Sequence, residues 1–261
     1  MKPSIPLLLA LLALLTGCRS LAGLPSEPAP PEVIVVGTLG PSHLEAEDYT
    51  LEDLEELLRG LRGDLLLIDL PPDRHAAAWS QFVRTGEVED PLVRRQPEVA
   101  GVLYPMALEG RIELLPCGAW NPAVEARREA LLEQWRTTRP RDLRAAERAG
   151  EDARRQLEAE GLAASARGVH TARHDELMAA AWEVYESRLG RDLGEGGWER
   201  ENDALLVRLG EALDGERGSG RRVLVVVDAR RKYRLRAGLA GRGDIVLRRV
   251  PEVLPASGSD T

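Results

Sequence analysis

The chain has 261 residues and a formal net charge of −8 at neutral pH. An acidic chain is a poor candidate for binding nucleic acid, whose phosphates require a basic surface, so we expect no nucleic-acid partner. Hydrophobic residues make up 43% of the chain and aromatic residues only 4%. This composition predicts a globular domain whose buried core is mainly aliphatic.

The first 17 residues have the layout of a secretory signal. Lys2 supplies a short positive start, and residues 5–15 form an almost unbroken apolar run. That run is shorter than the roughly 20 apolar residues that a spanning helix needs, so it is not expected to be a permanent anchor. The sequence Leu-Thr-Gly-Cys at residues 15–18 resembles the lipobox of bacterial lipoproteins. We therefore expect cleavage before Cys18 and attachment of lipid to this residue.

A lipid on Cys18 implies a protein of the bacterial cell envelope that is attached to a membrane by this lipid. Each buried methylene contributes about 0.8 kcal/mol, so several acyl chains hold a protein tightly to a bilayer. Arg19 stands where an aspartate, in the enterobacterial rule, would favour retention in the inner membrane. This favours the periplasm-facing outer membrane, with the inner membrane left open. Cys117 then has no intramolecular partner, and we expect it to be a small buried residue after a strand.

The folded part is expected to begin at Val33, after a tether of residues 18–32 that is rich in Pro and Ala. Residues 33–36 are apolar and β-branched, as in a buried parallel strand. After a loop, Thr50 and Asp53 have the spacing of a capping box at the start of a helix with an apolar stripe. A second buried strand follows at residues 65–68.

The rest of the chain continues this alternation around a long helical segment. Helical spacing predicts one helix over residues 98–108 and another at about 230–240. Strand patterns are expected at residues 111–115, 222–227 and 244–247. We expect a loose tail from residue 250. Residues 122–214 lack strand signals and are rich in Ala, Arg, Glu and Leu. The predicted fold class is α/β, with a mostly parallel central sheet of about five strands, flanking helices and a large helical insertion.

In open parallel sheets, ligands bind outside the carboxyl ends of the strands. Four segments follow predicted strands and should lie at this edge of the sheet, namely residues 37–43, Asp69, residues 117–120 and residues 228–232. His43, Asp69 and Asp228 are a donor set that could bind a divalent metal or perform acid–base chemistry. An alternative remains open, because aspartates that follow strands often cap the next turn.

Two further histidines have a spacing that is used in metal sites. His170 and His174 lie four residues apart, so they would share one face of a helix. Gly168 places the helix start close to His170, and we therefore expect an exposed helix start instead of a metal site.

The order of several motifs resembles the superfamily that groups TraB, Tiki, ChaN and erythromycin-esterase-like proteins. The likeness is carried by residues 33–39 with His43, residues 64–72, residues 198–202 and residues 223–239. The first resembles a strand with a Gly-x-x-His turn, the second a strand that ends in an acidic residue and prolines, the third the Glu-Arg-Asn start of a helix, and the fourth a closing strand and helix.

This chain also departs from the superfamily pattern. Asp69 stands where a glutamate is usual, Arg and Asn of the third motif are separated by Glu201, and the histidine of the closing motif is absent from residues 228–231. Groups in a catalytic site act as a unit, so losing some of them removes much of the rate. The resemblance therefore supports the fold more than the activity.

The resemblance implies three alternative functions. Tiki-like members are metal-dependent proteases and erythromycin-esterase-like members are hydrolases. In this chain His43 would be the base or ligand, Asp69 and Glu98 its acidic partners, and Arg200 the group that stabilises negative charge. ChaN-like members are lipoproteins that bind haem, with Tyr104 or a histidine as axial ligand. The third alternative is a non-enzymatic domain that binds a peptide, a small molecule or an envelope protein.

The expected function is that of a membrane-anchored envelope lipoprotein with a hydrolase-like domain that has lost part of its usual site. The cofactor is left open between a divalent metal and haem.

Overall fold

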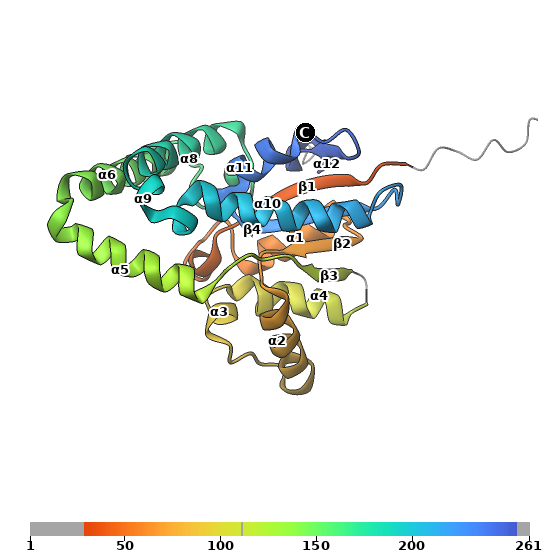
Figure 1. Ribbon diagram of the computed structural model, residues 1–261. Coiled ribbons are helices and arrows are strands. Elements are labelled where there is room, and N and C mark those ends of the chain that lie inside the picture. The colour runs from red at the N-terminus through yellow and green to blue at the C-terminus, as the bar shows by residue number, and fades with distance from the viewer. Residues whose placement is uncertain (1–28, 111, 255–261) are drawn as a thin grey trace, which may run out of the picture.

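Five strands form one parallel sheet in the order β3-β2-β4-β1-β5. The computed structural model describes residues 29–110 and 112–254, so Cys18, the first part of the tether, Arg111 and the tail from residue 255 lie outside the described residues. The strands are β1 (Glu32–Thr38), β2 (Leu65–Ile68), β3 (Glu113–Pro116), β4 (Arg222–Asp228) and β5 (Val246–Arg248). The predicted α/β class with about five parallel strands is confirmed (Figure 1).

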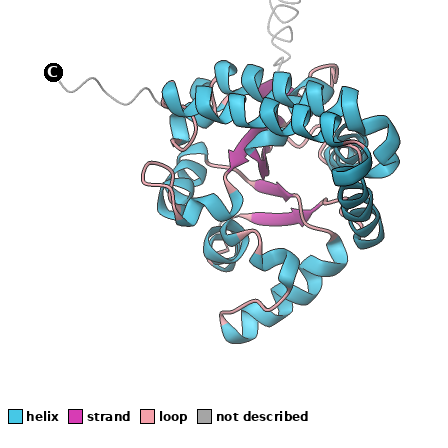
Figure 2. Ribbon diagram, turned by 90° about the vertical axis from the view of Figure 1, so that its left-hand side faces the viewer, coloured by secondary structure: helices cyan, strands magenta, loops and turns pink. Residues whose placement is uncertain are grey.

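Helices cover both faces of the sheet, because side chains of a strand point alternately to the two sides (Figure 2). On β1, Ile34 and Val36 belong to one core cluster, and Val33 and Val35 belong to the other. The first cluster includes residues of α1 (Leu51–Leu61), α2 (Pro72–Thr85), α3 (Pro91–Arg94), α4 (Tyr104–Leu108) and α12 (Val250–Val253). The second includes residues of α10 (Trp198–Gly215) and α11 (Ala229–Leu239).

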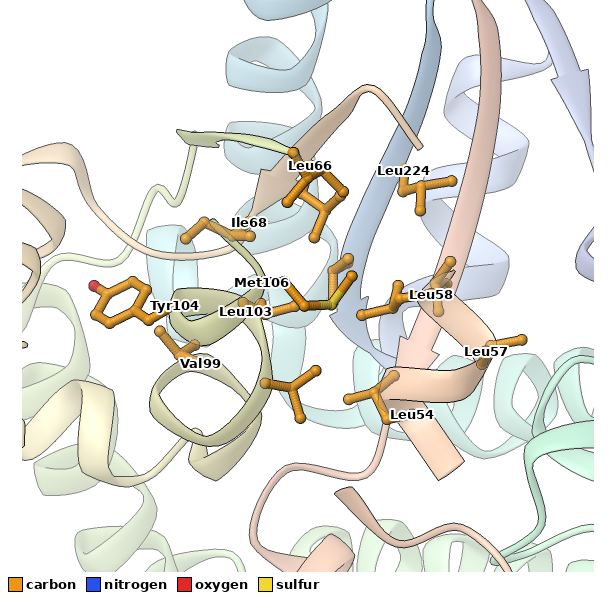
Figure 3. Close-up of a cluster of buried hydrophobic side chains, with 14 of the residues drawn as sticks. Leu54, Leu57, Leu58, Leu66, Ile68, Val99, Leu103, Tyr104, Met106 and Leu224 are labelled. Carbon is orange, nitrogen blue, oxygen red and sulfur yellow. The ribbon is translucent and has the colours of Figure 1, made fainter. Parts of the chain in front are cut away.

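The start of α1 shows the predicted capping box. The backbone N–H of Thr50 donates to Oδ2 of Asp53 over 2.7 Å, and the N–H of Asp53 donates to Oγ1 of Thr50 over 3.2 Å. The cap fixes where α1 begins. The apolar side chains of α1 then share one buried cluster with those of β2 (Figure 3). The helix expected over residues 98–108 differs from the prediction. It begins with one π-helical turn over Val99–Leu103, which has an i to i+5 hydrogen bond, and α4 follows directly.

The insertion over residues 122–214 is mostly helical, and its longest non-helical connection is residues 160–165. It contains α5 (Pro122–Thr138), α6 (Pro140–Ala159), α7 (Ala166–Val169), α8 (Ala172–Tyr185) and α9 (Arg191–Leu193) before α10. In Figure 1 most of these helices extend to the left of the sheet. Ala153 and Leu157 of α6 pack in a separate cluster with Leu177 and Met178 of α8. The insertion therefore has a small core of its own. No helix within the described ranges has the length and apolar character needed to cross a bilayer.

Candidate functional site

A cavity of about 620 Å³ lies at the carboxyl edge of the sheet. Its lining includes Ile68 and Asp69 from the end of β2, and Val227 and Asp228 from the end of β4. The chain leaves β1 towards the helices on one face and leaves β4 towards α11 on the other face. A crevice is expected where two neighbouring parallel strands diverge in this way. The cavity therefore lies where the rule for parallel sheets predicted it.

Glu98 is the buried carboxylate of this cavity, with only 5% of its surface exposed. Its Oε1 accepts a hydrogen bond of 2.8 Å from the hydroxyl of Thr38. Its Oε2 has no hydrogen-bond partner in another residue of the described chain. The pKa of Glu98 is raised to about 7, because burial and the charge of Asp228 outweigh the lowering effect of the bond from Thr38. The group can therefore hold or release a proton near neutral pH.

Asp69 faces the same cavity and is paired with Arg231. The Nε of Arg231 lies 3.9 Å from Oδ2 of Asp69. Burial raises the pKa of Asp69, and the charge of Asp228 adds to this effect while Arg231 opposes it. The Arg231 guanidinium also donates to Glu201 over 3.2 Å and lies over the ring of Trp198. These contacts fix the start of α11 against α10.

Asp228 both lines the cavity and caps α11. Its Oδ1 accepts from the N–H of Arg230 over 2.8 Å, and its Oδ2 accepts from the Arg230 guanidinium over 2.6 Å. Burial would raise the pKa of Asp228, but these hydrogen bonds and the charges of Arg230 and Arg231 lower it overall. The alternative left open from the sequence, an aspartate that caps the next helix, is therefore correct for Asp228 but not for Asp69, because α2 has no side-chain cap.

The cavity lining is also rich in arginine. Arg95 and Arg128 lie 3.6 Å and 3.9 Å from Oε1 of Glu125, and Arg128 also pairs with Glu201. The indole N–H of Trp120 donates to Glu125 over 2.7 Å. Arg200 is exposed, lines the cavity and forms no ion pair with another described residue.

His43 does not join this set. Only 2% of its surface is exposed, and it is absent from the described lining although Gly40 and Pro41 are part of it. Its Nε2 accepts from the N–H of Leu39 over 2.9 Å, so its Nδ1 carries the proton and donates to the carbonyl oxygen of Tyr49 over 2.7 Å. Both nitrogens are occupied by backbone groups, and neither is free to bind a metal or to accept a proton from a substrate.

The expected metal set is consequently not assembled in the described chain. His43 has no free nitrogen, and no three His, Cys, Asp or Glu side chains among residues 29–110 and 112–254 are placed to hold a metal ion. Asp69 and Asp228 line the cavity together, but each is held by an arginine. The residues present do not fit a metal ligated by His43, Asp69 and Asp228.

The expected haem ligand is also misplaced. Tyr104 is fully buried in the core (Figure 3). Its hydroxyl lies 3.3 Å from Nδ1 of His75, and its ring is in contact with those of Trp79 and Phe82. It does not line the cavity, whose described lining contains no His, Cys, Met or Tyr. These four residue types are the usual axial ligands of haem iron, so this cavity does not fit the group.

His170 and His174 are buried, and the expected exposed helix start is wrong. The Nε2 of His170 accepts from the N–H of Gly37 over 3.0 Å, and its Nδ1 donates to the carbonyl of Ala166 over 2.6 Å. His174 lies near the buried Lys232, whose ammonium pairs with Asp175. These groups dock the insertion onto the end of β1 and onto α11.

Cys117 is a small buried residue, as expected. Its Sγ faces the carbonyl of Ile68 at 3.4 Å, and burial together with the charge of Asp69 raises the pKa of its thiol well above the usual range. A thiol of this kind is not a reactive nucleophile.

Four of the predicted site residues line one cavity, namely Asp69, Glu98, Arg200 and Asp228. Sequence reasoning missed Glu125 and Arg128 on α5. The available signal was Asn121 followed by Pro122, a short loop after β3, because this pair starts a helix at the carboxyl edge of the sheet.

Comparisons of the chain with family models, with curated proteins and with solved structures find no match in any of the three.

Proposed function

We propose that the protein is a lipid-anchored protein of the bacterial envelope whose cavity binds a small polar molecule and hydrolyses it, with Glu98 as the acid–base group. The observation that carries this proposal is the buried Glu98 carboxylate, which lines the cavity and has one oxygen without a partner in another described residue. A perturbed carboxyl group in a cleft is the usual mark of an acid–base residue.

The proposed reaction is general-base hydrolysis. Ionised Glu98 accepts a proton from a water molecule while the water oxygen attacks the carbonyl carbon of the substrate, and the same carboxyl then returns the proton to the leaving group. Thr38 orients the carboxylate through Oε1. Arg200, which has no ion pair in the described chain, stabilises the negative charge on the substrate oxygen. A pKa of about 7 suits both proton transfers near neutral pH.

The proposal includes membership of the superfamily whose motifs the sequence resembles. The motifs that resemble the TraB, Tiki, ChaN and erythromycin-esterase-like superfamily supply Asp69, Arg200 and Asp228, and Gly40 lies between the first motif and its histidine. All four contribute to the cavity lining, which supports a shared site. The proposed location is the periplasmic side of the outer membrane, and it rests on the lipobox at Cys18 and on Arg19.

A second candidate is binding without turnover. The described lining contains no Ser, Thr, Cys, His, Tyr or Lys, so it offers no side-chain nucleophile other than carboxylates. This composition favours a site that captures a ligand, and the same experiment separates the two candidates.

The test uses the full chain purified from membranes in a non-ionic detergent and a panel of chromogenic esters, amides and phosphate esters. We expect turnover that falls at least about 100-fold in Glu98→Gln, because a positioned acid–base group contributes about that much or more. Glu129→Gln, on the exposed side of α5, is the matched control and should keep the activity. A chelator should leave the rate unchanged, because no described ligand set fits a metal.

Turnover that survives Glu98→Gln would contradict the assignment of this residue. If no substrate of the panel is hydrolysed but ligands bind, the second candidate stands instead.

A further inference from the structure

Most charged side chains of the cavity are paired with one another in the described chain. Arg95 and Arg128 pair with Glu125, Arg230 pairs with Asp228, and Arg231 pairs with Glu201 and Asp69. Three charged groups of the lining have no ion pair with a described residue, and these are Glu98, Glu195 and Arg200. Glu195 and Arg200 are exposed to water, whereas Glu98 is buried.

The unpaired groups are chemically different from the rest of the lining. A buried carboxylate oxygen without a donor costs free energy, and a ligand that brings an N–H group into the cavity removes that cost. An ammonium group is the best such donor, because its hydrogen bond to a carboxylate is charge-assisted. The free guanidinium of Arg200 offers a planar pair of donors that fits an acidic group.

We propose that the cavity selects a small amphoteric molecule, with an ammonium group that lies against Glu98 and an acidic group that lies against Arg200. This inference rests on the proposed function, since it names the substrate class of the same site. The bond to be hydrolysed would lie between the two charged groups. A carboxylate accepts several hydrogen bonds, so the ammonium group and the attacking water would both lie against Glu98. The guanidinium of Arg200 has five N–H donors, so it would bind the acidic group and the substrate oxygen together.

The size and the remaining lining agree with this substrate class. The cavity volume of about 620 Å³ falls in the range of small-molecule sites, about 300 to 1,000 Å³. Leu92, Val99 and Leu103 contribute apolar surface to the lining, which suits a short carbon skeleton. A purely anionic ligand would meet the carboxylates of Asp69, Glu98 and Asp228 and is disfavoured by their charge.

The test is isothermal titration calorimetry of the full chain in non-ionic detergent with three probes. They are alanyl-alanine, its N-acetyl derivative and its C-terminal amide, so each derivative removes one charge. We expect either change to weaken binding by about tenfold to a hundredfold, the value of one charge-assisted hydrogen bond. O-phosphoethanolamine, which has a phosphate as its acidic group, tests whether that group is a carboxylate or a phosphate.

Two variants assign each charge to its residue. In Glu98→Gln, alanyl-alanine and its N-acetyl derivative should bind with equal affinity, while the preference for the free carboxylate persists. In Arg200→Gln the opposite pattern is expected, with the acid and the amide bound equally. Glu129→Gln and Arg127→Gln, both exposed on α5 and outside the described lining, should keep the wild-type pattern.

Equal affinity of the wild-type protein for all three dipeptides would overturn the inference, and so would absence of binding to every amphoteric probe at millimolar concentration. The dipeptide series on the wild type decides the matter even where a variant fails to fold. Predicted binding without any hydrolysis would remove only the proposed enzymatic function. Hydrolysis of a neutral substrate that depends on Glu98, without the charge pattern, would remove only this inference.

Discussion

The hydroxyl of Thr38 at the end of β1 donates a 2.8 Å hydrogen bond to Oε1 of Glu98, which lies 60 residues further along the chain. Thr38 is itself buried, and its hydrogen bond holds only one of the two carboxylate oxygens, Oε1. The other carboxylate oxygen has no partner in another described residue. Ionisation of Glu98 therefore costs free energy in the folded state that it does not cost in the unfolded chain.

This relationship predicts how stability depends on pH. The pKa of Glu98 is raised from 4.5 to about 7, so the folded state holds a proton that the unfolded state releases between these values. Stability contributed by this group should fall as pH rises from about 4.5 to 7, by up to about 3 kcal/mol at roughly 1.4 kcal/mol per unit. Urea unfolding at pH 5 and pH 8 should show a smaller loss in Glu98→Gln than in the wild type. Equal losses in the two proteins would contradict the prediction.

The buried histidines should oppose this effect. Burial, together with the charge of Lys232, lowers the pKa of His170 and of His174 from 6.5 to about 4. A lowered histidine pKa contributes stability above 6.5 that is lost as pH falls towards 4. NMR titration of the imidazole nitrogens should show both rings neutral at pH 5.5. A titration midpoint near 6.5 for either ring would show that it is not buried as described.

The pair of Lys232 and Asp175 offers a test of how the insertion is held. Lys232 is 2% exposed, and Asp175 is its ion-pair partner. Asp175→Asn should lower the free energy of unfolding by about 3 kcal/mol, because it leaves a buried ammonium without a counter-charge. The double variant with Lys232→Met should recover most of that loss, as measured by urea unfolding. A loss below about 0.5 kcal/mol in the single variant would mean that the ammonium reaches water.

Gly118 marks a close approach between two segments that shape the cavity. A Cβ at this position would lie 2.5 Å from the backbone carbonyl carbon of Leu70, and the Gly118 N–H donates to the Leu70 oxygen over 3.0 Å. Gly118→Ala should destabilise the protein by about 1 to 3 kcal/mol, because one backbone segment must move. Gly150→Ala, in open space on α6, should instead be neutral or stabilising, by up to about 1 kcal/mol. Thermal unfolding of both variants provides the comparison.

The proposed lipid anchor on Cys18 can be tested on the intact chain. Cells that express it should incorporate labelled palmitate into the protein, and Cys18→Ala should abolish that label. The wild-type protein should sediment with outer-membrane fractions after osmotic lysis. A labelled Cys18→Ala protein would show that another residue carries the lipid.

The sequence predicted the fold class and the position of the cavity because both follow from the alternation of strands and helices. Once parallel strands are expected, Asp69 and Asp228 must lie at their carboxyl ends. Glu98 and Arg200 came from the family resemblance, and the structure places both in the same lining.

The role of His43 could not be predicted, because its partners are backbone groups set by a local turn. The short helical turn Gly40–Leu44 brings Nε2 onto the N–H of Leu39, and the following loop brings the carbonyl of Tyr49 to Nδ1. Spacing in the sequence cannot distinguish such a histidine from one that faces a cavity. The contact between Arg128 and Glu201 could not be predicted from the sequence either. It depends on how α5 packs against α10, and the two residues are 73 positions apart in the chain.

The position of β4 has a consequence for how this chain can fold. β1 and β2 do not pair with each other, and β4, which begins at Arg222, lies between them and pairs with both. The described sheet therefore cannot close until almost the whole chain is available. A polypeptide that crosses a membrane from its N-terminus would stay open during transit and gain its central strand only at the end. A chain that ends before residue 222 lacks β4 and β5, so β1 has no partner strand and the pair of β2 and β3 stays separate from it.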